Sequence, residues 1–320
     1  MPSTEPPLIV MVGPTAVGKT ELAITLAERL NGEIISADSR LFYRGMDIGT
    51  AKPSALELQR VPHHLIDVAE PDETWSLALF QKTAREVIDN IHARGRLPFL
   101  VGGTGQYIRA VIEGWLVPEL APNPGLRAAL EAWGKEVGAS GLFARLGIID
   151  PGAAAQIDYR NQRRTIRALE VILSTGRLFS EQRQRTNTPY TLLIIGLKRP
   201  RPELYTRIDV RIEAMLARGL VEEVKSLLNR GLSPGASALS AIGYREMISY
   251  LVGELTLDEA VAQMKRATRI FVRRQANWFK ESDPTINWFE VKSGIEEKIE
   301  EKIRAFEGFS VFLKSPDQFS

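Results

Sequence analysis

Short apolar runs alternate with amphipathic helical segments along the first third of the chain. Apolar side chains recur every three or four positions in residues 20–30 and 77–91, which is the spacing of one helix face. Around these segments lie apolar runs at residues 8–12, 34–37, 64–68 and 98–101. Strands that are apolar throughout and separated by helices are typical of a parallel sheet with helices on both faces. The sequence therefore predicts an α/β fold.

The pattern changes near residue 118, where prolines and a glycine interrupt it. From residue 126 to about residue 185 the chain is rich in Ala, Leu and Arg, with helical periodicity and no strand-like run. A buried-strand pattern returns at residues 191–197, followed by helical patterns at residues 203–218, 220–229 and 256–280, the last opened by a capping box, Thr256 with Glu259. We expect a discontinuous core of residues 1–118 and 191–280, a helical insertion of residues 119–190, and a weakly structured tail of residues 281–320.

Composition excludes several classes of protein. With 44% hydrophobic and 25% charged residues among 320, the chain resembles an ordinary globular protein rather than a disordered or fibrous one. The absence of cysteine excludes a disulfide scaffold, a thiol nucleophile and an iron–sulfur cluster. His63 and His64 point in opposite directions if extended, which favours a structural role over metal binding. No signal-peptide pattern and no apolar run of membrane-spanning length is present, so we expect a cytoplasmic protein without a membrane partner.

Positive charge is concentrated in two segments, although the net charge is only +2. Residues 159–185 contain seven arginines against two glutamates, and residues 265–280 contain six basic residues and no acid. Charge runs are usually solvated faces, but intrahelical ion pairs cannot form in the second segment. Trp278 and Phe279 beside its arginines also suit stacking on unpaired bases. These segments predict contact with a nucleic acid.

A phosphate-binding loop (P-loop) lies between the first apolar run and the first helical pattern. Residues 13–20 match the pattern G-x-x-x-x-G-K-[ST]. In such loops the backbone N–H groups and the helix N-terminus surround phosphate oxygens, the lysine supplies charge, and the hydroxyl of the last residue can hold Mg²⁺. The predicted site for a di- or triphosphate consists of Gly13, Pro14, Thr15, Ala16, Val17, Gly18, Lys19 and Thr20. By itself, such a loop most often indicates a kinase or another NTPase.

Other polar residues are expected at the same edge of the sheet. Asp38 and Ser39 follow an apolar run, and ligands of open α/β sheets bind at the carboxyl ends of strands. A carboxylate there could be a metal partner, a general base or a helix cap. Residues 102–105 form a second glycine-rich turn after another run. Arg207 and Arg211 share a helix face that points either into the pocket or into solvent.

Taken together, these stretches resemble the tRNA dimethylallyltransferases (tRNA isopentenyltransferases), from about Ile9 to Lys280. The resemblance rests on Gly13–Thr20, Asp38-Ser39, Met46–Pro53, Pro62–Asp67, Gly102–Tyr107, Arg167–Glu170, Ile242–Glu246 and Arg273–Phe279. It implies a P-loop NTPase-like core with an inserted helical tRNA-binding domain. The implied reaction is the Mg²⁺-assisted transfer of a dimethylallyl group from dimethylallyl diphosphate to N6 of the adenosine 3′ to the anticodon (A37), in tRNAs that read codons beginning with U.

The resemblance also implies residue roles. Asp38 is the general base, and Thr104 steadies the leaving oxygen. Lys19, Arg207 and Mg²⁺ on Thr20 neutralise the diphosphate, and a single copy of the chain holds the anticodon stem-loop. The implied tRNA contacts are Asp38, Ser39, Arg40, Leu41, Thr104, Arg127, Arg163, Arg164, Arg167, Gly243, Tyr244, Arg245, Arg273, Arg274, Gln275 and Trp278.

Three positions depart from the family pattern, and three other functions compete with it. Leu41 and Arg163 stand where the family has glutamine, and Gln106 stands where it has leucine, so we expect differences in tRNA recognition rather than in chemistry. The competing functions are a P-loop small-molecule kinase, a non-catalytic RNA-binding protein and a prenyltransferase of free adenine nucleotides. The two basic segments are larger than a metabolite requires, and the joint presence of Lys19, Thr20 and Asp38 argues against loss of catalysis.

Overall fold

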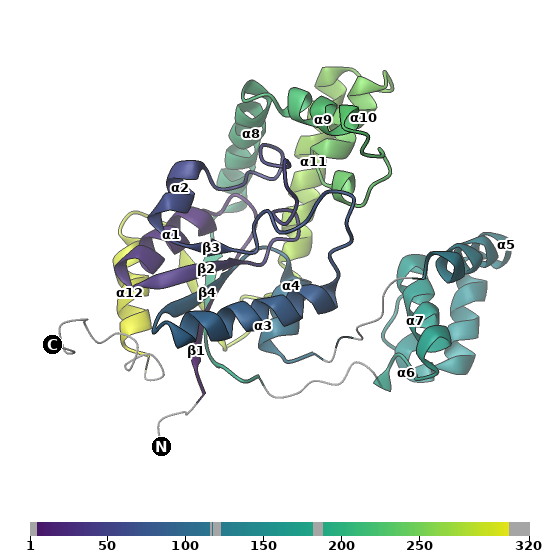
Figure 1. Ribbon diagram of the computed structural model, residues 1–320, viewed down its shortest axis with the longest axis horizontal. Coiled ribbons are helices and arrows are strands. Elements are labelled where there is room, and N and C mark those ends of the chain that lie inside the picture. Colours follow the sequence, from purple (N-terminus) through teal and green to yellow (C-terminus); the bar gives the residue numbers. More distant parts are fainter. Residues whose placement is uncertain (1–4, 116, 118–122, 182–187, 307–320) are drawn as a thin grey trace. The chain divides into compact units, whose positions relative to one another are not determined.

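The computed structural model describes residues 5–115, 117, 123–181 and 188–306 (Figure 1). It divides into two compact units, one formed by residues 1–112 with 188–320 and the other by residues 113–187. We call them the sheet unit and the helical unit. The expected insertion, residues 119–190, covers most of the helical unit.

A six-stranded parallel sheet forms the centre of the sheet unit, which confirms the predicted α/β fold. The strand order is β3-β2-β4-β1-β5-β6. The bounds are β1 Pro7–Val12, β2 Gly32–Ser36, β3 His63–His64, β4 Leu97–Val101, β5 Thr191–Lys198 and β6 Ile286–Glu290. The strand expected at residues 64–68 was too long, because Leu65 and Asp67 have φ values of 61° and 55° and turn the chain away after two residues.

Helices cover both faces of this sheet. Ile9 and Met11 of β1 pack with one group of helices, while Leu8, Val10 and Val12 pack with the other. The first group is α1 Lys19–Arg29, α8 Arg201–Ala217, α9 Leu220–Asn229, α10 Tyr244–Leu251, α11 Leu257–Gln275 and α12 Ile295–Arg304; the second is α3 Leu77–Ala93 and α4 Gly105–Ile112. The short α2 is Ala55–Arg60. The predicted capping box of Thr256 and Glu259 opens α11. No helix in the described ranges is long and apolar enough to cross a membrane.

The expectation of a weakly structured tail is wrong for its described part. Residues 286–290 form β6, which pairs with β5 along the sheet edge, and α12 packs against the core. Ile295, Ile299 and Ile303 are buried at a spacing of four residues, which places them on one helix face. The three isoleucines are separated by glutamates and lysines, so the high proportion of charged residues hides the helical spacing. Residues 307–320 lie outside the described part.

The helical unit has its own core. Its helices are α5 Pro124–Ile149, α6 Pro151–Ala154 and α7 Gln162–Thr175. Leu142, Leu146 and Leu169 are almost completely buried between them. Gly138, with a φ of 74°, interrupts α5. The packing of α5 against α7 places basic residues from both helices next to one another.

Candidate active site

The P-loop connects β1 to α1 at the carboxyl edge of the sheet. Gly13 has a φ of 150°, and a Cβ atom there would lie 2.7 Å from the carbonyl oxygen of Leu197, so a side chain does not fit. Gly18, with a φ of 108°, precedes α1 and supplies no side-chain cap. The first N–H groups of α1 therefore keep no capping side chain, and such groups bind anions.

Lys19 is folded back onto this loop. Its Nζ donates hydrogen bonds of 2.9 Å to the carbonyl oxygens of Gly13 and Pro14. Burial lowers the pKa of Lys19 to about 8, because the attraction of Asp38 only partly offsets desolvation and Arg211 adds repulsion. A bound diphosphate would stabilise the charged lysine, so the loop is suited to an anionic ligand.

Two arginines of α8 approach the loop, which resolves the ambiguity left by the sequence. Arg207 Nε donates a 2.8 Å hydrogen bond to the carbonyl oxygen of Ala16. Arg211 lines the adjoining cavity, where burial lowers its pKa and the charge of Asp38 opposes this shift. The family resemblance implies a role for Arg207 alone. The structure adds Arg211, and the spacing of four residues was the signal that pointed to it.

A cavity of about 430 Å³ lies next to the loop. It receives residues from the ends of β2 and β4, from the loop, and from α8 and α11. Among its lining residues are Thr15, Asp38, Ser39, Arg40, Gly103, Thr104, Gly105, Gln106, Arg211, Arg274, Gln275 and Trp278. Residues predicted from separate parts of the chain are thus brought to one site.

The side chains of Asp38 and Thr104 each accept a hydrogen bond from a backbone N–H group. Asp38 Oδ1 accepts a 3.0 Å hydrogen bond from the Arg40 backbone N–H. The hydroxyl oxygen of Thr104 accepts a 3.3 Å bond from the N–H of Ser39. No other hydrogen bond to Asp38 Oδ2 or from the Thr104 hydroxyl is found among the described residues, so both groups are available to a substrate in the cavity.

Gln275 connects the two glycine-rich turns. Its Oε1 accepts a 2.9 Å hydrogen bond from the Thr15 N–H, and its Nε2 donates a 3.0 Å bond to the carbonyl oxygen of Gly103. The residue is only 7% exposed, so its amide is occupied within the protein. Gln275 therefore aligns the two turns and also lines the cavity beside them.

Glu223 holds another wall of the cavity. Its carboxylate accepts hydrogen bonds from the backbone N–H groups of Asp47, Ile48 and Gly49 at 3.0, 2.7 and 3.1 Å, and from the Tyr244 hydroxyl at 2.6 Å. Gly49 also lines the cavity. The role of Glu223 was not predicted, because nothing in the local sequence distinguishes it from a solvated glutamate.

Several predicted tRNA contacts are placed elsewhere. Tyr244 is completely buried and Gly243 is also buried, which contradicts direct contact at these positions. Leu41 does not line the cavity, whereas the exposed Gln106 does. Arg245 and Arg273 are exposed outside the cavity.

The basic helix α11 has more acidic partners than its own sequence suggested. Lys265 pairs with Glu213 at 3.0 Å, and Arg269 pairs with Asp209 at 2.6 Å, both acids being on α8. On α11 itself, Arg266, Arg273 and Arg274 remain exposed. The cationic surface is therefore smaller than predicted and lies toward the C-terminal end of the helix.

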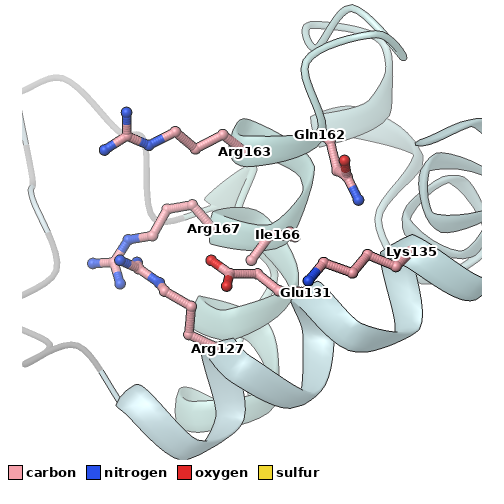
Figure 2. Close-up of a pocket in the computed structure, with 7 residues that line it drawn as sticks. All are labelled: Arg127, Glu131, Lys135, Gln162, Arg163, Ile166 and Arg167. Atoms are coloured by element: carbon pink, nitrogen blue, oxygen red, sulfur yellow. The ribbon is translucent and has the colours of Figure 1, made fainter. Parts of the chain in front are cut away.

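The helical unit contains a second cavity of about 590 Å³ (Figure 2). Its lining residues are Arg127, Glu131, Lys135, Gln162, Arg163, Ile166 and Arg167. Three of the four arginines predicted to contact tRNA in this segment line the cavity, and Arg164 does not. The cavity is therefore rich in positive charge.

The side chains that commonly bind metal ions are not clustered in the described part of the chain. The described residues contain no group of three or more His, Asp or Glu side chains able to hold a metal ion. His64 instead bonds Glu33 at 2.6 Å, consistent with the structural role expected for the histidine pair. Thr20 is exposed at the start of α1. Its hydroxyl suits Mg²⁺, a cation that commonly takes few protein ligands and several phosphate oxygens.

A parallel α/β sheet with a P-loop at its carboxyl edge, next to a cavity lined by a carboxylate and arginines, places this chain in the class of P-loop proteins that bind phosphate groups. Residues 41–282 match the model of the IPP transferase family, and residues 6–69 match that of isopentenyl transferases. The chain belongs to the IPP transferase family.

Individual relatives and solved structures support the same family assignment. A tRNA dimethylallyltransferase of Roseiflexus sp. (strain RS-1) is 57% identical over 274 residues, 86% of this chain and 90% of that protein. The crystal structure of the full-length tRNA isopentenylpyrophosphate transferase from Bacillus halodurans is 44% identical, with a TM-score of 0.71 over 95% of this chain and 97% of that one. A eukaryotic dimethylallyltransferase acting on tRNA is 25% identical, with a TM-score of 0.80 over 98% of this chain and 81% of that one.

Proposed function

We propose that this protein transfers a dimethylallyl group from dimethylallyl diphosphate to N6 of adenosine 37 of tRNA and releases diphosphate. The observation that carries the proposal is the single cavity shared by Asp38, Thr104 and the P-loop residue Thr15, in a chain of this family. A kinase would use the same loop. The family match over residues 41–282 favours prenyl transfer instead.

The P-loop would hold the leaving group. The uncapped N–H groups at the start of α1, together with Lys19, Arg207 and Arg211, would stabilise a diphosphate bound at the loop. As the bond between the allylic carbon and its oxygen breaks, negative charge grows on the diphosphate, and fixed positive groups stabilise it. The Thr20 hydroxyl would hold Mg²⁺, and this ion would supply further positive charge for the leaving group.

Asp38 and Thr104 act at opposite ends of the transfer. The exocyclic N6 amine attacks the allylic carbon, and Asp38 Oδ2 accepts the proton that the amine loses. The Thr104 hydroxyl, whose oxygen already accepts from Ser39, donates its proton toward the departing oxygen. The N–C bond forms, the C–O bond breaks, and the proton ends on the carboxylate.

The target adenine must leave its stack to enter the cavity. Trp278, 38% exposed at the cavity wall, offers an aromatic face, and Arg274 offers a positive charge. Ser39, Arg40, Arg245 and Arg273 would add contacts near the site. Arg127, Arg163, Arg164 and Arg167 of the helical unit would contact the anticodon stem.

Nucleoside mass analysis tests this function. Unmodified tRNA is incubated with the purified protein, Mg²⁺ and dimethylallyl diphosphate, with ATP replacing the prenyl donor in a parallel reaction. We expect adenosine carrying one added C5H8 unit only when the prenyl donor is present. ATP consumption with a small-molecule acceptor, and no prenylated adenosine, would refute the proposal and support a kinase.

A further inference from the structure

Two arginines from different helices share one carboxylate oxygen in the helical unit. Arg127 of α5 donates from Nη2 to Glu170 Oε2 at 2.7 Å, and Arg167 of α7 donates from Nη1 to the same oxygen at 3.0 Å. The other oxygen, Oε1, accepts a 3.2 Å hydrogen bond from the backbone N–H of Asn123. Glu170 is therefore bonded on both oxygens and fixes two positive groups at one point.

Glu170 is completely buried, with a side-chain exposure of 0%. Burial alone would raise its pKa, but the hydrogen bonds and charges of Arg127 and Arg167 outweigh burial and hold the pKa below its usual value. The carboxylate is thus ionised at neutral pH. One buried negative charge balances only one of the two guanidinium groups.

The remaining donors of this pair face the second cavity. The side chains of Arg127 and Arg167 are 38% and 34% exposed, so each keeps N–H groups beyond those used on Glu170. Figure 2 shows their guanidinium groups side by side, with Arg163 extended toward the same side. Adding Lys135 gives four positive groups, against Glu131 and Glu170, and a surplus of two positive charges.

This arrangement suits a phosphate group. Two planar guanidinium groups held next to one another can each donate to a different phosphate oxygen, and phosphate is a favoured partner of arginine. Without an anion between them the two groups would repel each other and separate. A buried carboxylate behind the pair removes that repulsion without occupying the cavity.

We propose that Glu170 is a positioning residue that holds Arg127 and Arg167 as a preformed pair for one backbone phosphate of the tRNA. The inference rests on the proposed function, which supplies the tRNA. Glu170 itself does not touch the RNA. Its contribution is to reduce the ordering that the two arginines would otherwise undergo on binding.

An electrostatic role and a positioning role of Glu170 predict opposite effects on tRNA binding, so one substitution distinguishes them. In Glu170→Gln the cavity becomes more positive, so a purely electrostatic role predicts tighter tRNA binding. If Glu170 positions the arginines, binding weakens despite the added charge, by roughly 10- to 150-fold, the scale expected for loss of one charge-assisted contact. Glu131→Gln is the matched control, because Glu131 lines the same cavity, is exposed, and has no ion pair among the described residues. We expect its affinity to equal or exceed that of the unmodified protein.

The measurement is the dissociation constant for unmodified tRNA at several salt concentrations, together with the KM for dimethylallyl diphosphate. Glu170→Gln should raise the dissociation constant for tRNA. It should leave the KM for dimethylallyl diphosphate unchanged, since the diphosphate-binding loop belongs to the sheet unit. Equal or tighter tRNA binding by Glu170→Gln overturns the proposal.

A second variant decides the matter if Glu170→Gln loses helical structure by circular dichroism. The double variant Arg127→Lys with Arg167→Lys keeps both charges and Glu170 but removes the planar groups. The proposal then requires weaker tRNA binding, and unchanged binding overturns it. Failure of the proposed function would differ from both results, because the unmodified protein itself would neither bind tRNA nor form prenylated adenosine.

Discussion

Replacing Gln275 by alanine should weaken diphosphate binding without greatly changing tRNA binding. The substitution removes two hydrogen bonds, one to the Thr15 N–H and one from the amide to the Gly103 carbonyl. Each neutral hydrogen bond contributes about 0.5–1.5 kcal/mol net, so the two together stabilise the relative position of the turns by about 1–3 kcal/mol.

The loss of stabilisation in Gln275→Ala should lie toward the lower end of this range of about 1–3 kcal/mol. Both turns border the open cavity, where water can replace the lost amide at Thr15 and Gly103. If about 1–2 kcal/mol appears in ligand affinity, the dissociation constant rises roughly five- to thirtyfold. The neighbouring exposed arginines of α11 keep their positions, so tRNA affinity should change less than about twofold on the same scale.

Calorimetric titration with inorganic diphosphate and Mg²⁺ measures the effect directly. Gln106→Ala is the matched control, because it removes the same kind of side chain from the same cavity, where Gln106 is exposed and no hydrogen bond of its side chain is found within the described ranges. Its diphosphate affinity should be unchanged. Unchanged affinity in Gln275→Ala as well, with normal thermal stability, would refute the idea that this amide aligns the two turns.

Four further predictions concern single residues. Asp38→Ala should reduce single-turnover prenylation by ~10²–10⁴ while tRNA binding is nearly unchanged, and an active variant would remove Asp38 from the role of base. Arg273→Ala should flatten the dependence of log affinity for tRNA on log salt by about one unit, and an unchanged slope would mean that this residue contacts no phosphate. Because Lys19 with its pKa of about 8 loses its charge above that pH, kcat/KM for dimethylallyl diphosphate should fall as pH rises through about 8, and a flat profile to higher pH would contradict this. Glu223→Ala should lower the free energy of unfolding in urea by about 3 kcal/mol, since it removes the common acceptor of three backbone N–H groups and of the buried Tyr244 hydroxyl; a change as small as that of the exposed Glu222→Ala would refute the anchoring role.

The sequence predicted those parts of the fold that depend on local pattern. Apolar runs identified the strands near the sheet centre, and the P-loop motif identified the phosphate site. Charge patterning located the basic segments but not their partners, because the acids that neutralise Lys265 and Arg269 come from α8.

Contacts between distant residues account for most of what the sequence could not predict. Gln275 and Glu223 act on turns more than a hundred residues away, and no spacing rule connects them with those turns. Tyr244 was assigned to tRNA contact, yet its ring is buried and its hydroxyl binds Glu223. The secondary structure of the C-terminal tail was not predicted for a different reason. Its isoleucines have a clear helical spacing that the abundance of charge obscured.

Both outer strands of the sheet limit the risk of aggregation. An exposed strand edge offers unpaired N–H and C=O groups to other chains, and natural proteins shorten or cover such edges. On one side β3 has only two residues. On the other, β6 pairs with the eight-residue, largely apolar β5. A chain ended after residue 282 would lack β6 and leave the eight-residue β5 as the outer strand, with its backbone N–H and C=O groups unpaired on that side. The C-terminal segment therefore covers an edge that would otherwise favour pairing with other chains.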